Sequence, residues 1–364
     1  MTEEILEMIS EPLLKWYDSD HRMLPWREDK TAYRVWVSEI MLQQTRVEAV
    51  KPYFNRFVDK FPDATTLAEA QEEILLKYWE GLGYYSRVRN MKKAAVIIKD
   101  KYDGMIPNDY KELLGLPGIG TYTAGAIASI AYNMPVAAVD GNVLRILSRV
   151  RMDEENISLP AVKKRVEQEL NIIIPKDRSG DFNQAMMELG ATICIPNGQA
   201  KCGECPWQEF CQARINDRVL EFPKKALKKD RVIEKKTVLI LKDGERVAIH
   251  KRPSRGLLAG MYELPMFEGH LKEKEVLKRL KDIELDVLRI QSLEPAKHIF
   301  SHREWHMIGY AIRVDELQKM KEENAGFLFI DPKDTEDSYP IPTAFASYVK
   351  YVNIKLGNEN FNKG

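Results

Sequence analysis

The sequence has no net charge, few cysteines and no long apolar run, and each of these absences excludes a class of protein. Its 55 Lys and Arg residues balance 55 Asp and Glu residues, which excludes a uniformly basic nucleic-acid binder but allows local basic patches. No stretch reaches the roughly 18 consecutive apolar residues that a membrane span needs. The first residues, Met1-Thr2-Glu3-Glu4, lack the basic-then-apolar order of a signal peptide. We therefore expect a cytoplasmic protein with no membrane partner.

The length and composition indicate a folded protein of more than one domain. With 364 residues, and about 150 residues per domain as a guide, two or three domains are expected. Hydrophobic residues make up 44% of the chain and charged residues 30%, which is typical of globular proteins.

The pattern of apolar and polar residues changes near residue 220. Residues 1–220 show apolar residues at three- and four-residue steps, interrupted by Pro and Gly, which predicts short helices. Thr45-x-x-Glu48 has the pattern of a capping box, so a helix is expected to start there. Residues 221–236 contain seven basic and three acidic residues and suggest an exposed linker. Beyond residue 237, a hairpin around Asp243-Gly244, a helix over 271–282 and a strand over 306–313 predict a separate α+β domain.

All four cysteines lie between residues 194 and 211, in the pattern Cys194-x7-Cys202-x2-Cys205-x5-Cys211. Disulfides are not expected in an intracellular chain, and four clustered thiolates suit a metal centre. Zinc and a 4Fe-4S cluster both remain possible. Zinc ribbons usually show two separate Cys-x2-Cys pairs, so the single pair here favours iron and sulfur.

The segment Leu116-Pro117-Gly118-Ile119-Gly120 lies between two expected helices. The glycines allow a tight turn, and backbone amides at the start of the following helix can face a phosphate. This is the helix-hairpin-helix pattern of contact with the DNA backbone. An ordinary turn between helices would not need both glycines in this order, so we name Leu116, Gly118 and Gly120 as the backbone-contacting residues.

Asp140 follows Gly120 by twenty residues, and the cysteine cluster comes after it. This order resembles the helix-hairpin-helix DNA glycosylase superfamily that includes endonuclease III. In bifunctional members a lysine follows the second glycine by two residues, whereas this chain has Tyr122 there. The resemblance therefore implies a glycosylase without Schiff-base lyase chemistry.

A closer resemblance comes from the run Val35-Trp-Val-Ser-Glu-Ile-Met-Leu-Gln-Gln-Thr45, which is similar to the MutY family of adenine-specific mismatch glycosylases. In that family this segment supplies the catalytic acid, here Glu39. Its neighbours Trp36, Val37, Ile40 and Met41 are apolar, and burial among them would raise the pKa of Glu39. The alternative interpretation is that Glu39 is an ordinary solvent-exposed charge on a helix, and its apolar neighbours argue against this.

The resemblance also implies a set of site residues. Asp140 would stabilise the sugar cation, and Asn142 and Tyr122 would hold Asp140 and the sugar region. The adenine pocket would contain Trp26, Arg27, Leu42, Gln184 and Met187. Gln44, Thr45, Leu82 and Tyr84 would fill the base stack beside 8-oxoguanine, and Phe300, Ser301 and His302 would contact that base. Cys194, Cys202, Cys205 and Cys211 would hold the 4Fe-4S cluster.

The C-terminal domain resembles the Nudix fold, but the metal-binding Gly-x5-Glu-x7-Arg-Glu box is missing. Gly269 and Glu275 have the first spacing, and the chain then continues to Ile283-Glu284. This domain is therefore expected to recognise the lesion and not to hydrolyse nucleotides.

Together these features predict a multidomain protein with a mostly α-helical glycosylase domain and a Nudix-like α+β domain. The helical domain would span 1–220, with a six-helix barrel over about 29–133 and an iron–sulfur module from 1–28 and 134–220. The basic linker would span 221–236 and the Nudix-like domain 237–364. The expected substrate is duplex DNA with A:8-oxoguanine or A:G, and the expected form is a monomer in the bacterial cytosol or nucleoid. The alternatives are a related glycosylase for another base and a non-catalytic lesion-binding protein.

Overall fold

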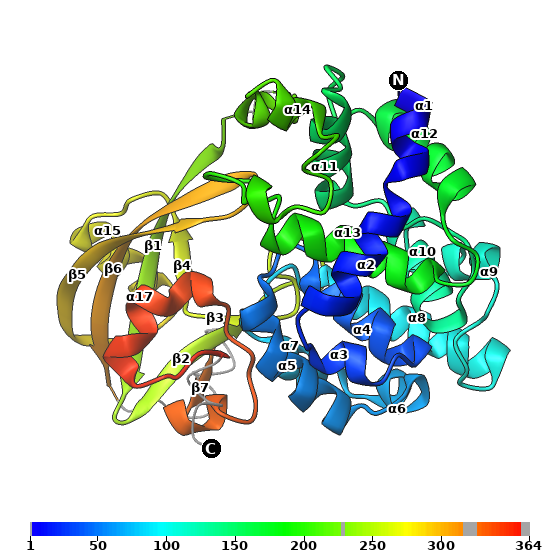
Figure 1. Ribbon diagram of the computed structural model, residues 1–364. Coiled ribbons are helices and arrows are strands. Elements are labelled where there is room, and N and C mark those ends of the chain that lie inside the picture. The colour runs from blue at the N-terminus through cyan, green and yellow to red at the C-terminus, as the bar shows by residue number, and fades with distance from the viewer. Residues whose placement is uncertain (1, 227–229, 316–325, 358–364) are drawn as a thin grey trace. The chain divides into compact units, whose positions relative to one another are not determined.

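The computed structural model describes residues 2–226, 230–315 and 326–357, and it divides into two compact units (Figure 1). The first unit contains Met1–Glu69 and Asn90–Leu227, and the second contains Ala70–Arg89 and Lys228–Gly364. Of the described helices, none is both long and apolar enough to cross a bilayer.

The first unit is built from helices, as expected. Most are short because Pro and Gly interrupt the chain between them. They are α1 (Thr2–Met8), α2 (Ser10–Asp20), α3 (Pro25–Glu28), α4 (Ala32–Leu42), α5 (Val47–Lys60), α6 (Ala64–Glu69), most of α8 (Ser86–Tyr102), α9 (Tyr110–Leu114), α10 (Thr121–Tyr132), α11 (Gly141–Arg151), α12 (Pro160–Ile173), α13 (Ser179–Thr192) and α14 (Gln212–Ile215), with 3-10 turns η1 (Cys202–Glu204) and η2 (Val219–Glu221).

Helix α5 shows how the apolar pattern determines packing. Val50, Tyr53, Phe54 and Phe57 recur at helical spacing, and all four are buried. The expected capping box does not form, because the helix starts at Val47 and its N-cap is Arg46, which makes no side-chain cap hydrogen bond.

Helices α9 and α10 flank the tight turn predicted from Leu116 to Gly120. Leu116 is buried, and Gly120 is the N-cap of α10. Gly118 has a φ of 79°, and a Cβ there would lie 2.7 Å from the Cβ of Asn90. The turn therefore requires glycine at this position for its backbone conformation and for space.

The second unit is organised around a seven-stranded mixed sheet with the order β3-β2-β1-β6-β5, in which β4 pairs with β1 and β7 with β2. The two long central strands β1 and β6 are parallel, whereas β1 and β2 form the expected antiparallel hairpin. The strands are β1 (Val232–Asp243), β2 (Arg246–Lys251), β3 (Tyr262–Glu263), β4 (Met266–Glu268), β5 (Val287–Ile299), β6 (Arg303–Val314) and β7 (Leu328–Ile330). The helices are α7 (Glu72–Trp79), the start of α8, α15 (Glu273–Asp282) and α17 (Ala346–Val349), with 3-10 turns η3 (Pro332–Thr335), η4 (Thr343–Phe345) and η5 (Lys350–Val352).

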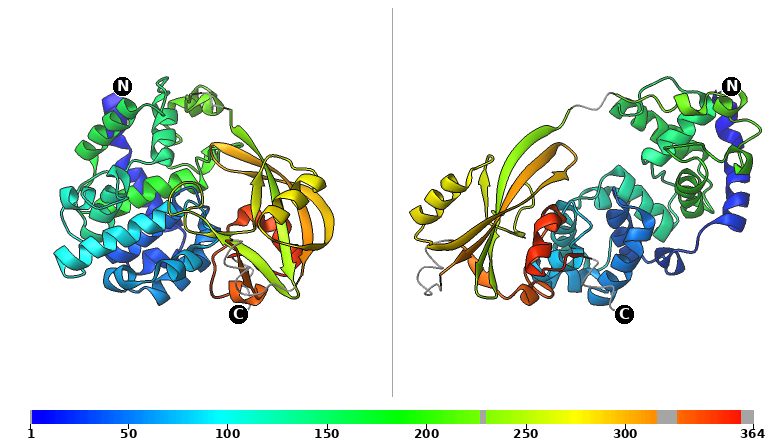
Figure 2. Two further views of the ribbon diagram at one scale, coloured as in Figure 1. Left: turned by 180° about the vertical axis from the view of Figure 1, so that it is seen from behind. Right: turned by 90° about the vertical axis from the view of Figure 1, so that its left-hand side faces the viewer.

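Both faces of this sheet are covered. Alternate residues of β1 point to opposite sides, so Val238 and Ile240 join one apolar core and Leu239 and Leu241 join the other. The first core is closed by α17 and the second by α15, the red and yellow helices on opposite faces of the sheet in Figure 2. The result is the expected α+β fold, with a helix on each side.

Three parts of the chain differ from the sequence-based expectation. Residues 232–236, expected in the linker, begin β1, because they pair with β6 from Val232 onwards. Phe222, also expected in the linker, is buried. Residues 70–89, expected in the helical domain, group with the second unit instead.

Candidate active site and cysteine cluster

One cavity of about 970 Å³ in the first unit gathers the residues expected at the reacting nucleotide. Helices α3, α4, α10, α11 and α13, together with the segment after α4, contribute its walls. All nine residues predicted for catalysis and for the adenine pocket line it: Trp26, Arg27, Glu39, Leu42, Tyr122, Asp140, Asn142, Gln184 and Met187. Gln44 and Thr45, predicted to fill the base stack beside 8-oxoguanine, line the same cavity. Because these residues are spread over 160 positions of the chain, only the fold brings them together.

Glu39 projects from α4 into this cavity and is only 5% exposed. Burial raises the pKa of Glu39 to about 7, and the negative charge of Asp140 adds to the rise, although the hydrogen bond from Tyr122 opposes it. Tyr122 donates this hydrogen bond to Oε2 of Glu39 and also contacts Sδ of Met187 at 3.5 Å. Near neutral pH the Glu39 carboxyl is thus available in its protonated form.

Asp140 is the N-cap of α11, and the N-terminus of this helix holds its carboxylate. Its Oδ1 accepts hydrogen bonds from the backbone N–H groups of Asn142 and Val143 at 2.9 and 2.8 Å. Its Oδ2 accepts one from Nδ2 of Asn142 at 2.7 Å. Burial raises the pKa of Asp140, but these donors and the positive end of the helix favour the ionised form. The two carboxyl groups therefore occupy different environments.

The side chain that holds Asp140 is itself connected to the cysteine region. Arg145 is buried, and its Nη2 donates to Oδ1 of Asn142 at 2.9 Å. Its Nε donates to the carbonyl oxygen of Cys194 at 2.9 Å. The position of Cys194 is thus coupled to that of Asp140 through Arg145 and Asn142.

Glu188 is a residue of this cavity that the sequence analysis missed. It lies on α13, one turn after Gln184 and next to Met187, so helical spacing from these two residues could have indicated it. Its carboxylate accepts hydrogen bonds from Arg22 at 2.6 and 3.0 Å and from Arg27 at 2.8 Å. Burial alone would raise its pKa, but these arginines outweigh burial and hold the pKa below its usual value.

A second cavity, of about 530 Å³, lies within the second unit. It is lined by Leu82 and Tyr84 and by the segment Phe300-Ser301-His302, which connects β5 to β6. The sequence separates these two groups by more than 200 residues, and the structure places both on one cavity.

Gln44 and Tyr84, both expected to fill the base stack, have left-handed backbone conformations. Their φ angles are 60° and 48°, although neither residue is glycine. Such conformations cost about 1–3 kcal/mol each and concentrate at functional sites. Gln44 and Thr45 line the first cavity, and Leu82 and Tyr84 line the second.

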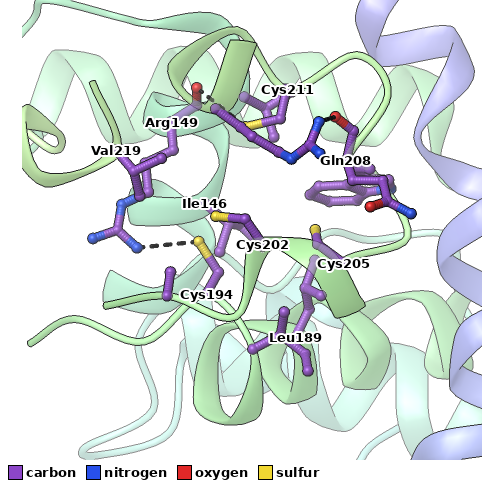
Figure 3. A pocket seen from close by; sticks show the side chains of 14 residues that line it. Ile146, Arg149, Leu189, Cys194, Cys202, Cys205, Gln208, Cys211 and Val219 are labelled. Atoms are coloured by element: carbon purple, nitrogen blue, oxygen red, sulfur yellow. Dashed lines mark hydrogen bonds between the residues drawn. The ribbon is translucent and has the colours of Figure 1, made fainter. Parts of the chain in front are cut away.

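The four cysteines converge on a third cavity in the first unit, as Figure 3 shows. All four are free thiols, and Nη1 of Arg149 donates to Sγ of Cys194 at 3.2 Å. Within the described part of the chain, no three His, Cys, Asp or Glu side chains are grouped so as to hold a single metal ion.

The comparisons with known proteins agree with this architecture and define the class of protein. Residues 37–176 match the HhH-GPD superfamily of base excision DNA repair proteins, and residues 237–351 match the NUDIX domain. The structure of a thermostable thymine-DNA glycosylase has a TM-score of 0.54 and 25% identity, covering 59% of this chain and 99% of that one. A trapped endonuclease III–DNA intermediate has a TM-score of 0.51 at 24% identity, over 60% of this chain and 99% of that one, and supports the fold alone.

Relatives that match over most of the chain narrow the class further. The adenine DNA glycosylase of Buchnera aphidicola subsp. Schizaphis graminum (strain Sg) is 34% identical and covers 91% of this chain and 94% of its own. The adenine DNA glycosylase of Mus musculus is 35% identical over 84% of this chain and 70% of its own. The chain belongs to the adenine DNA glycosylase family.

Proposed function

We propose that the protein removes adenine mispaired with 8-oxoguanine or guanine from duplex DNA, by base flipping and acid-assisted hydrolysis of the N-glycosidic bond. The observation that carries this proposal is the pairing of two buried carboxyl groups in one cavity. Glu39 has a pKa near 7, and Asp140 is held by three hydrogen bonds at a helix N-terminus. The names of the relatives support adenine as the base released.

In the proposed reaction, the Glu39 carboxyl donates its proton to a ring nitrogen of the flipped adenine. The bond between the sugar C1′ and the base then breaks, its electrons go to the base, and adenine leaves as a neutral molecule. The hydrogen bond from Tyr122 fixes one oxygen of Glu39, which orients the other toward the cavity. Flipping costs a few kcal/mol, and less at a mismatch.

The sugar is left with oxocarbenium character, which the Asp140 carboxylate stabilises. Asn142 restricts this carboxylate through both its backbone N–H and its side chain. Water then adds at C1′ and releases a proton to the solvent, which leaves a neutral abasic site. Tyr122 cannot form a Schiff base, so strand cleavage by that route is not expected.

Around the flipped base, the pocket provides one apolar wall and several polar groups. Trp26, Leu42 and Met187 supply apolar surface, and Gln184 can donate to and accept from a purine edge. Glu188 and Arg22 hold the Arg27 guanidinium in place, so it presents a fixed donor to the base.

The second cavity suits recognition of the 8-oxoguanine that remains in the duplex. Leu82 and Tyr84, together with Phe300, Ser301 and His302, combine stacking surface with polar atoms. The missing Nudix box argues against nucleotide hydrolysis in this domain.

The cysteine cavity suits a 4Fe-4S cluster held by Cys194, Cys202, Cys205 and Cys211. All four thiols line this one cavity, and four cysteine ligands are the usual set for such a cluster. A cluster there would be structural, and it would fix the backbone of Cys194, to which Arg145 is bonded.

The turn before α10 would contact the DNA backbone through Leu116, Gly118 and Gly120. We expect the protein to act as a monomer in the cytosol.

The test of the proposed function uses a duplex with one A:8-oxoguanine pair, which is incubated with the protein and then heated in alkali to cut abasic sites. We expect cleavage of the adenine strand only after alkali, and none with an A:T duplex. Binding without any cleavage would overturn the proposal, and cleavage before alkali would contradict the assignment of Tyr122.

A further inference from the structure

The turn that carries Ser301 is held from the neighbouring strand by a partly buried carboxylate. Glu234 on β1 lies opposite Trp305 on β6 in the parallel register. Nε1 of Trp305, which is 1% exposed, donates to Oε2 of Glu234 at 2.9 Å. Nη1 of Arg303 donates to Oε1 of the same carboxylate at 2.5 Å. Glu234 thus fixes the guanidinium of Arg303 relative to the sheet.

The fixed guanidinium determines the tautomer of the preceding residue, His302. Nε of Arg303 donates to Nε2 of His302 at 2.9 Å. A guanidinium N–H can only donate, so Nε2 of His302 must accept and the ring proton must be on Nδ1. Nδ1 lies 3.2 Å from Oγ of Ser301, and it therefore donates to that oxygen.

The hydroxyl of Ser301 consequently accepts from His302 and retains its own proton. Within the described residues Ser301 makes no other side-chain hydrogen bond, and it lines the second cavity. On the other side of the turn, the Phe300 ring packs edge-on against Trp305 and His298, with centroids 5.0 and 4.6 Å apart. The turn is therefore held at its start by the packing of Phe300 and at its end by the hydrogen bond from Arg303 to His302.

We propose that Glu234 and Arg303 are positioning residues that fix His302 as its Nδ1–H tautomer and thereby make Ser301 a hydrogen-bond donor into the second cavity. Resting on the proposed function, this assigns Ser301 to the carbonyl oxygen at C8 of 8-oxoguanine. Guanine has a C–H group at this position and offers no acceptor there. One neutral hydrogen bond contributes about 1 kcal/mol, which corresponds to a discrimination of about fivefold.

The kinetic test compares single-turnover adenine release opposite 8-oxoguanine with release opposite 8-bromoguanine, which has bulk at C8 but no comparable acceptor. We expect the wild type to prefer 8-oxoguanine and Arg303→Met to reduce this preference about fivefold. Arg313→Met removes the same charge from an exposed position on the same strand and should leave the preference unchanged. The inference is overturned if the wild type has no preference, or if Arg303→Met keeps it.

A double-mutant cycle with Ser301→Ala separates positioning from general damage to the turn. If Arg303 acts through the Ser301 hydroxyl, Arg303→Met should have no further effect on the preference in the Ser301→Ala background. Equal effects in both backgrounds would show that Arg303 acts by another route.

The tautomer can be observed directly in the full-length protein. In ¹⁵N-histidine NMR, with His302→Gln to assign the signal, we expect a protonated Nδ1 for His302, the less common form in solution. Arg303→Met should return the proton to Nε2. A protonated Nε2 in the wild type would overturn the inference even if adenine release is normal. Conversely, failure to release adenine opposite 8-oxoguanine would defeat the proposed function and leave this measurement intact.

Discussion

At the scale of single residues, the proposed acid can be tested by a substitution that preserves shape. Glu39→Gln keeps an oxygen for the Tyr122 hydroxyl but cannot give up a proton. We expect adenine release to fall at least about a hundredfold, the usual contribution of a general acid, with little change in binding to A:8-oxoguanine duplex. Single-turnover rates and gel-shift titrations measure the two quantities.

Glu28→Gln is the matched control, because it makes the same chemical change at an exposed position on α3. It should leave both the rate and the affinity unchanged. Normal release by Glu39→Gln would contradict the role of Glu39 as acid.

The pH dependence follows from the raised pKa of Glu39. The group acts in its protonated form, so the rate of adenine release should fall as the pH rises through about 7.

The same raised pKa makes the stability of the protein depend on pH. A pKa that is higher in the folded than in the unfolded state favours folding at low pH, and this contribution is lost as the pH rises from about 4.5 through 7. Relative to Glu39→Gln, the wild type should therefore lose up to about 3 kcal/mol of stability between pH 4.5 and 8. Urea unfolding of both proteins at several pH values checks this, and a constant difference would contradict it.

At the scale of the elements, a buried ion pair at the end of α7 makes hydrogen bonds to the C-terminal segment. Nζ of Lys77 lies 2.5 Å from Oε2 of Glu80 and also donates to the carbonyl oxygen of Thr335. The backbone N–H of Gly357 donates to Oε1 of Glu80 at 3.3 Å. Lys77 and Glu80 are 4% and 0% exposed, and burial raises the pKa of Glu80 despite the nearby lysine. Glu80 directly precedes the loop that carries Leu82 and Tyr84, so this pair anchors that loop.

Removing one partner of a buried pair leaves an uncompensated charge, which usually costs about 3–5 kcal/mol. We therefore expect Lys77→Met to destabilise the protein by this amount in urea unfolding. Adding Glu80→Gln should recover much of the loss, because no buried charge then remains without a partner. Simple additivity of the two changes would contradict the pairing.

Local sequence patterns predicted those helices and strands whose contacts are mostly with residues close by in the sequence. The apolar spacing of Val50 to Phe57 gave the buried face of α5, and the Asp243-Gly244 turn gave the hairpin of β1 and β2. The start of β1 was missed because Val232–Lys236 is held by pairing with β6, some 70 residues away. Helical spacing from Gln184 could have placed Glu188 at the cavity, but its ion pairs with Arg22 and Arg27 could not be predicted, because these arginines come from a distant segment.

At the scale of the whole molecule, the resemblance to a family supplied most of the candidate site, and the fold supplied its geometry. The apolar neighbours of Glu39 predicted its burial, but no pattern indicated that Tyr122, 83 residues away, would hold its carboxyl group. Likewise, composition could not assign residues 70–89 to the second unit. That grouping depends on contacts such as Glu73 with Lys251 at 2.6 Å and Arg89 with the carbonyl oxygen of Ala259.

This grouping makes a prediction about how the molecule unfolds. Helix α7 is separated from β1 by about 150 residues, yet it shares ion pairs and hydrogen bonds with the second unit. Regions that share such contacts tend to open as one cooperative unit in native-state hydrogen exchange. In rising urea, we therefore expect the amides of Leu75, Leu76 and Lys77 to lose protection together with those of β1 and β6. If they lose protection with α4 and α10 instead, α7 belongs energetically to the helical unit, and the sequence-based boundary at residue 220 describes the molecule better.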